Sequence, residues 1–171
     1  DGGELPWRAD ITGGPDGTIA YGFVARPARD FATNRTGFIV LHPLERVVGC
    51  PVEVEHVDGS REHTRFPDLI DPSQCFLDIR ALTHEPIPGV RASCRMEGDI
   101  WECEDHRNWS DASFKTYVRP LSMPRPYVIP GGSEVRQTVS LTFSPGVGHL
   151  AATPRPDRVA ISVGGPSGRT M

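Results

Sequence analysis

The stretch V-R-A-S-C-R-M-E-G-D-I-W-E-C-E-D, residues 90–105, predicts two antiparallel strands joined by a tight turn. Gly98 stands at the first central position of a two-residue loop, which suits a type II′ hairpin turn. In that register Cys94 faces Cys103, and the two-residue period of a strand puts one core-like set on a single face. The members of this set are Ala92, Cys94, Met96, Trp101, Cys103 and Asp105.

The opposite face of this predicted hairpin is polar and leaves two interpretations open. Its members are Arg91, Ser93, Arg95, Glu102, Glu104 and His106. They either pair opposite charges across the strands toward solvent or form a concave wall that binds a polyol. Open exposure of a concave face would favour the second interpretation.

Alternation of apolar and polar residues predicts further strands over residues 18–25, 36–42, 51–57, 60–66, 75–84 and 133–143. Asp58-Gly59 predicts a hairpin whose second arm is polar enough for an exposed sheet edge. The strand at 75–84 is expected to place Phe76, Asp78, Arg80 and Leu82 on one face. We predict an all-β fold, a mostly antiparallel β-sandwich, and a galactose-mutarotase-like sandwich is one form of it.

Two other segments carry turn and proline signals. Residues 120–130 hold four prolines and are expected to be extended without sheet pairing. The first residue is Asp1 and not Met, which predicts a piece of a longer protein. Residues 1–145 are expected to form the β-sandwich domain without its N-terminal part. Residues 146–171 are expected to form a linker and a strand that lead into a following domain.

Composition excludes several classes of protein. The 171 residues are enough for one domain with a substantial core. A net charge of −4 offers no basic surface, so neither nucleic acid nor an anionic membrane is expected as a partner. No apolar run approaches the roughly 18 residues of a membrane span. The four cysteines show no C-x-x-C spacing, which argues against a zinc knuckle.

Polar and aromatic residues are concentrated in E-C-E-D-H-R-N-W-S-D-A-S-F-K-T-Y-V-R, residues 102–119. Residues 102–105 continue a strand, whereas residues 107–116 fit neither regular period and are predicted to form a loop. Loops on rigid β scaffolds commonly carry function, and this one holds Trp109 and the single lysine of the chain, Lys115. The alternative is a solvated connection whose aromatic side chains close the end of a sandwich.

Within this stretch, R-N-W-S-D-A-S-F-K-T-Y, residues 107–117, resembles the signature R-N-W-T-D-A-S-[FY]-K-T-Y of the N-terminal β domain of bacterial D-apionate lactonases. Five further segments agree in the same order: N-R-T-G-F-I-V-L-H-P (34–43), V-E-H-V-D-G (54–59), F-P-D-L-I (66–70), D-I-R-A-L-T-H-E (78–85) and M-E-G-D-I (96–100). The resemblance covers roughly residues 16–142. His106 and Ser110 stand where the family usually has glutamine and threonine.

The resemblance implies a cytoplasmic hydrolase of carbohydrate metabolism that opens a sugar-acid lactone by water attack, in the catabolism of apiose. It implies two partners, the lactone substrate and a following barrel domain of the same chain. Thiols stay reduced in the cytoplasm, and we expect no cofactor. The fragment alone is expected to be inactive.

Lactone hydrolysis needs a base for the water, a donor for the developing oxyanion and an acid for the leaving alkoxide. Asp111 and Asp105 are the candidate bases. Arg107 and Lys115 are candidate oxyanion donors, and His106 is a candidate proton shuttle because histidine titrates near neutral pH. The candidate substrate-binding residues are Asn108, Trp109, Tyr117, Arg35 and His42.

Three alternatives compete with this assignment. A divalent metal is a less favoured route, and its ligands would be His84, Glu85, Asp105 and His106. A non-catalytic accessory or carbohydrate-binding sandwich would support a separate barrel. Its ion-pair knot would comprise Asp105, Arg107, Asp111 and Lys115. A third alternative is a mutarotase-like ring opening at the concave face. We predict that Lys115, with Asp111 and Arg107, lies at a pocket and not on open surface, which would favour catalysis in this domain.

Overall fold

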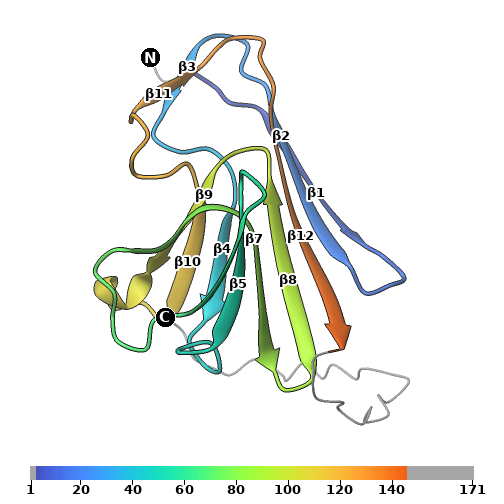
Figure 1. Cartoon of the computed structure of the whole chain (residues 1–171). Helices are drawn as coiled ribbons and strands as arrows, with labels where there is room; N and C mark the ends of the chain where they lie inside the picture. The colour runs from blue at the N-terminus through green and yellow to red at the C-terminus, as the bar shows by residue number, and fades with distance from the viewer. Residues whose placement is uncertain (1–2, 146–171) are drawn as a thin grey trace, which may run out of the picture.

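The computed structural model describes residues 3–145, and the regular secondary structure of these residues is almost entirely β-strand (Figure 1). In chain order they are β1 (Trp7–Gly13), β2 (Ile19–Ala25), β3 (Phe31–Thr33), β4 (Ile39–Pro43), β5 (Pro51–His56), β6 (Arg61–Arg65), β7 (Gln74–Ile87), β8 (Val90–Glu97), β9 (Trp101–Asp105), the short 3-10 helix η1 (His106–Trp109), β10 (Ser113–Val118), β11 (Tyr127–Ile129) and β12 (Val135–Pro145).

One long antiparallel sheet carries the fold. Its strand order is β1-β2-β12-β8-β7-β9-β10-β4, with the β5–β6 hairpin attached to β7, and β3 and β11 form a separate two-stranded sheet. Figure 1 shows the long sheet curling, with β1, β2 and β12 on one side and β4, β9 and β10 on the other. The prediction of an all-β, mostly antiparallel, sandwich-like fold is confirmed. The more specific likeness to galactose mutarotase stays a prediction.

The core lies on the inner face of the curled sheet. Phe66 packs against Phe76 and Phe114 with ring centroids 5.2 and 5.0 Å apart. Trp101 and Met96 are completely buried beside them. Burial of each such side chain contributes roughly 1.5–3 kcal/mol. Every member of the predicted inner face of residues 90–105 is buried, which confirms that part of the alternation.

The predicted hairpin between residues 90–97 and 100–105 is wrong, because β8 and β9 do not pair with each other and instead pair with the later and the earlier part of β7. Cys94 is opposite Leu82, and Cys103 is opposite Phe76. Gly98 still turns the chain, with φ of +93°, but it packs on the backbone of Arg136 in β12. The predicted turn at Gly98 is therefore correct, but the strand that pairs with β8 and β9 comes from elsewhere in the sequence. Both cysteines are free thiols in the core.

Strand β7 also departs from simple alternation. Phe76 and Ile79 are both buried, although they are three residues apart, and Leu77 between them is exposed. Asp78 has φ of +51°, so it inserts a bulge that moves the following side chains to the other face. The predicted face of Phe76, Asp78, Arg80 and Leu82 is therefore wrong.

The loop predicted at residues 107–116 is too long. Only η1 and residues 110–112 interrupt the strands, and β10 begins at Ser113. Five of the six residues of β10 are buried, so both of its faces are covered. A strand covered on both faces has no polar alternation for a sequence pattern to detect.

The other strand predictions have mixed outcomes. Strands β2, β12 and the β5–β6 hairpin are confirmed, and β6 is the exposed edge that its sequence predicted. The strand predicted at 36–42 begins only at Ile39. The proline-rich segment 120–130 was expected to form no sheet pairs, but it contains β11, which pairs with β3. Strand β1 was not predicted. The linker and strand predicted at 146–171 lie outside the described residues, so the proposed domain boundary stays a prediction.

An ion-pair ladder occupies the outer face of β5, β6 and β8. Arg95 donates to both oxygens of Glu55 at 2.7 Å, across the small Ala81 of β7 that lies between them in register. Arg91 and Arg61 both contact Glu53, at 3.1 and 2.8 Å. Arg91 and Arg95 thus form ion pairs across strands, but with Glu53 and Glu55 of β5 and not with the glutamates of the predicted face.

His42 lies in the core, where β4 ends. Its ring Nε2 is 2.9 Å from the Thr116 hydroxyl, and its ring packs beside Phe66 and His84. Burial lowers the pKa of His42 from 6.5 to about 4, and the neighbouring His84 adds to the effect. A neutral buried ring with these neighbours is a structural group.

We predict that acid destabilises the fold through His42. The folded state binds its proton less readily than the unfolded state, so this contribution to stability is complete above pH 6.5. It declines as the pH falls toward 4, by about 3 kcal/mol in all. In urea titrations between pH 7 and 4, His42→Gln is expected to flatten this slope. His63→Gln, which changes an exposed ring, serves as control. An unchanged slope in His42→Gln would contradict the assignment.

Candidate functional site

Strands β9 and β10 and the helix η1 bring a set of polar and aromatic side chains to the outer face of the sheet. Glu104 is at its centre. One of its carboxylate oxygens accepts a hydrogen bond from the Trp109 indole at 2.8 Å, and the other is 3.4 Å from Nε2 of His106. Lys115 is directly opposite Glu104 in the strand register. We call the following residues the outer cluster: Arg35, Glu104, His106, Trp109, Lys115 and Tyr117.

Tyr117 joins the two ends of this cluster. Its hydroxyl donates to Glu102 at 2.6 Å, and the same carboxylate oxygen accepts from the Leu121 backbone N–H. The Arg35 guanidinium is 4.1 Å and the Lys115 ammonium 5.6 Å from the centre of the tyrosine ring. Burial, followed by the Glu102 carboxylate, raises the pKa of Tyr117 well above its ordinary value. The phenol therefore stays protonated and holds two cations near its ring.

The surface of the outer cluster is partly apolar. Trp109 is 71% exposed, and Leu41 and Ile39 are exposed opposite Lys115 and Tyr117 on β4. Among the ion pairs of residues 3–145, none includes Lys115. An exposed indole beside a free ammonium and a carboxylate is suited to stacking on a sugar ring and bonding its hydroxyls.

The inner side of the same segment is structural. Asp105 is fully buried and forms a 2.6 Å ion pair with Arg107. The Arg107 guanidinium also donates to the backbone carbonyls of Pro67, Asp68 and Leu69. The Asp105–Arg107 ion pair thus fixes the loop before β7 against the start of η1.

The hydrogen bonds around Asp105 keep it charged. Burial alone would raise the pKa of Asp105, but the hydrogen bonds from Arg107 and from the Asp71 N–H outweigh it and lower that pKa. Asn108 adds to the same loop contact, because its amide donates to the carbonyls of Asp71 and Asp105. Asp105, Arg107 and Asn108 therefore lie in a structural network and not in the outer cluster.

Asp111 lies at the margin of the cluster. Its side chain is 61% exposed, one oxygen is 3.3 Å from Nδ1 of His106, and the other caps the Ala112 N–H. Each ring nitrogen of His106 thus faces a carboxylate, Asp111 on one side and Glu104 on the other. Arg107 is bonded to Asp105, whereas Asp111 contacts His106, so the common pocket expected for Asp111, Arg107 and Lys115 stays a prediction. Of the expected ion-pair knot, only Asp105 and Arg107 are paired.

The residues considered for a metal are not brought together. His84 packs against Phe66 and His42 in the core, and Glu85 accepts a hydrogen bond from the Gly89 N–H. Asp105 and His106 belong to the segment around η1. Within residues 3–145, no group of three or more histidine, cysteine, aspartate or glutamate side chains is arranged to hold a metal ion.

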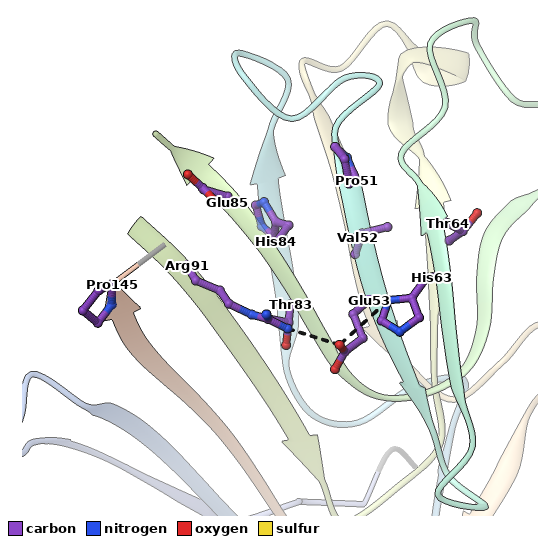
Figure 2. Close-up of a pocket in the computed structure, with 10 residues that line it drawn as sticks. All are labelled: Pro51, Val52, Glu53, His63, Thr64, Thr83, His84, Glu85, Arg91 and Pro145. Carbon is purple, nitrogen blue, oxygen red and sulfur yellow. Dashed lines mark hydrogen bonds and ion pairs between the residues drawn. The ribbon is translucent and has the colours of Figure 1, made fainter. Parts of the chain in front are cut away.

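A hollow of about 360 Å³ opens on the ion-pair ladder (Figure 2). Figure 2 shows Arg91 and His63 directed toward Glu53 across this hollow, with Thr83 and Thr64 on neighbouring strands. The charges there already neutralise one another. A sugar would have to compete with these ion pairs, so the outer cluster is the stronger candidate site.

Sequence reasoning did not single out Glu104 and Glu102, although they are central to the arrangement. Both were placed on a polar strand face that either pairs charges or binds a polyol, and neither was named as a site residue. The available signal was alternation itself, since Glu102, Glu104 and His106 share one face. What was missing was the pairing with β10, which sets Tyr117 against Glu102 and Lys115 against Glu104.

Together, the curled antiparallel sheet and its outer cluster define an all-β domain with a polar and aromatic surface. Residues 1–146 match the sequence family described as "D-apionate lactonase, N-terminal domain", and the chain belongs to this family. It is 51% identical over 154 residues to a D-apionate lactonase of Brucella anthropi, an alignment that includes 90% of this chain. The chain spans about a quarter of the length of that relative. No helix in the described residues is long and apolar enough to cross a bilayer.

We predict that breaking the Asp105–Arg107 ion pair is strongly destabilising. Asp105→Asn leaves a largely buried guanidinium without its counter-ion, which typically costs about 3–5 kcal/mol. Asp10→Asn is the matched control, because it removes an aspartate that also pairs with an arginine two residues away, but on exposed β1. Its unfolding midpoint in urea is expected to stay unchanged. Equal midpoints for the two variants would show that the Asp105–Arg107 ion pair is dispensable.

Proposed function

We propose that this chain is the N-terminal β domain of a cytoplasmic hydrolase that opens a sugar-acid lactone, D-apionate lactone, by attack of water. The observation that carries the proposal is the 51% identity to a D-apionate lactonase over 90% of the chain. The partners in this proposal are the lactone and a following domain of the same polypeptide, the expected barrel. The relative extends well beyond the matched region, which supports a further domain.

The outer cluster contains the residue types that lactone opening needs. His106 is held between Asp111 and Glu104, so its ring is oriented for a part in proton transfer. The ammonium of Lys115 is a candidate for the developing oxyanion, since no described carboxylate neutralises it in an ion pair. The exposed Trp109 indole offers a surface on which the sugar ring can stack.

A second candidate function is favoured by the Asp105–Arg107 ion pair. Two of the residues first assigned to catalysis stabilise the segment around η1, as an accessory domain would require. In that case the outer cluster contacts the following domain or feeds the lactone to it. The two candidates differ in whether the outer cluster contributes to the chemical step.

We predict that Asp111→Asn in the full-length protein lowers lactone turnover at least about a hundredfold while the fold stays intact. The loss falls within the usual range for a group that takes part in proton transfer. Turnover is followed by proton release, and folding by thermal melting. Asp16→Asn is the matched control, because Asp16 is also exposed and also accepts a hydrogen bond from a nearby backbone N–H.

The opposite pattern identifies the accessory function. If Asp111→Asn keeps its turnover but melts at a lower temperature, Asp111 is a structural counter-ion of His106. Catalysis then belongs to residues outside this domain.

We also predict that the 171 residues alone do not hydrolyse D-apionate lactone, because about three-quarters of the relative's length lies outside the matched region. The assay compares the purified 171-residue protein with the full-length protein at equal concentration. Turnover by the shorter protein at a rate near that of the full-length protein would show that the domain is a complete enzyme.

A further inference from the structure

A second hollow lies next to the outer cluster and has no role in the chemistry considered so far. It has a volume of about 770 Å³ and is lined by Thr33, Asn34, Arg35, Met123 and Arg125. The lining comes from the segment between β3 and β4 and from the segment between β10 and β11. Figure 1 shows β3 and β11 together beyond one end of the long sheet. None of the residues that line this hollow belongs to the ion-pair ladder on β5 and β8.

The lining is positively charged. It contains two guanidinium groups, Arg35 and Arg125, and no carboxylate. Neither arginine takes part in any ion pair of the described part of the chain. The Nε atom of Arg35 is also buried without a hydrogen-bond partner among these residues. A buried charged donor without a partner is costly, and an acceptor bound to the Arg35 guanidinium would offset part of this cost.

Arg35 is held in a fixed position. Its guanidinium rests 4.1 Å above the centre of the Tyr117 ring, and its backbone carbonyl accepts the Thr33 hydroxyl at 2.9 Å. Gln137 fixes the next part of the loop, because its side chain bonds the Thr36 carbonyl and the Phe38 N–H. A planar guanidinium in a fixed orientation is pre-organised to bind a carboxylate through two parallel hydrogen bonds.

The loop requires a glycine at position 37. The residue has φ of +136°, and a Cβ there would lie 1.8 Å from the side-chain oxygen of Gln137. The segment N-R-T-G at 34–37 therefore combines a close approach to Gln137 with the exposed Asn34 and the stacked Arg35. Asn34 adds an amide donor at the rim of the hollow.

We propose that this hollow is a carboxylate-binding subsite for the open sugar acid. The proposal rests on the proposed lactonase function. Water adds to the lactone carbonyl carbon, the ring C–O bond breaks, and the ring oxygen leaves as a hydroxyl with one proton. The new carboxylic acid releases its own proton and becomes a carboxylate. The neutral lactone lacks this charge, so Arg35 and Arg125 distinguish product from substrate.

The test measures binding to the full-length protein by calorimetry, with D-apionate and its neutral reduced polyol as probes. Arg125→Gln is the first variant, because Arg125 is exposed and its loss disturbs little packing. The affinity for D-apionate is expected to fall about tenfold or more, the usual effect of one charge-assisted hydrogen bond. The affinity for the polyol is expected to change less than about twofold.

Arg35→Gln is the second variant and is expected to give the same charge-selective loss. Arg8→Gln is the matched control, an exposed arginine on β1, and is expected to leave both affinities unchanged. Equal losses for both probes would show recognition of hydroxyls and would overturn the proposal, as would unchanged D-apionate affinity in both variants.

The outcomes also separate this proposal from the proposed function. Turnover of D-apionate lactone by the wild-type protein is measured in parallel. Turnover without charge-selective binding refutes the subsite and leaves the lactonase function standing. Charge-selective binding without turnover of any lactone supports the subsite and refutes the function.

Discussion

The arrangement of this domain depends on the backbone hydrogen bonds of β7. Its first residues pair with β9, its later residues pair with β8, and β5 pairs with the same later part. Buried N–H and C=O groups must be paired. By pairing with β5, β8 and β9, β7 satisfies this condition along a large part of the curled sheet. The bulge at Asp78 lies between the two parts and lets Phe76 and Ile79 both enter the core. Removing β7 from this place would leave β8 and β9 with no common neighbour.

The Asp105–Arg107 ion pair is the second constraint, and it controls what the outer face presents. A buried ion pair stabilises a structure only when its remaining hydrogen bonds are satisfied, and here three backbone carbonyls accept from Arg107. Alternation places Asp105 on the inner face and Glu104 on the outer face. Because Asp105 also caps η1, the same contact that fixes the inner loop directs His106 toward Glu104 and sets Trp109 in solvent.

Local patterns in the sequence predicted which residues are buried better than they predicted which strands pair. Met96, Trp101 and Cys103 were correctly assigned to the core, because alternation is a property of one strand at a time. The pairing of β8 and β9 with β7 could not be predicted, because it depends on residues about twenty positions earlier in the chain. The sequence predicts a loop in place of β10, because a strand buried on both faces has no alternation of apolar and polar residues. The family could be recognised, since several motifs in one order do not depend on pairing. Which of residues 105–111 belong to the inner structural network and which to the outer cluster could be seen only in the structure.

The two charged regions of the outer surface differ in a way that bears on function. On the ion-pair ladder, Arg91 and Arg95 are matched by Glu53 and Glu55, so a polar ligand gains little from replacing contacts that already exist. Around Tyr117, neither Arg35 nor Lys115 is in an ion pair of the described residues, and Glu102 is buried and bonded to the tyrosine hydroxyl and to the Leu121 N–H. Tyr117 keeps Arg35 and Lys115 near one ring, and they remain available to an anion. Unmatched charge held in a fixed position is what distinguishes a binding surface from a solvated one, and it connects the outer cluster to the neighbouring hollow.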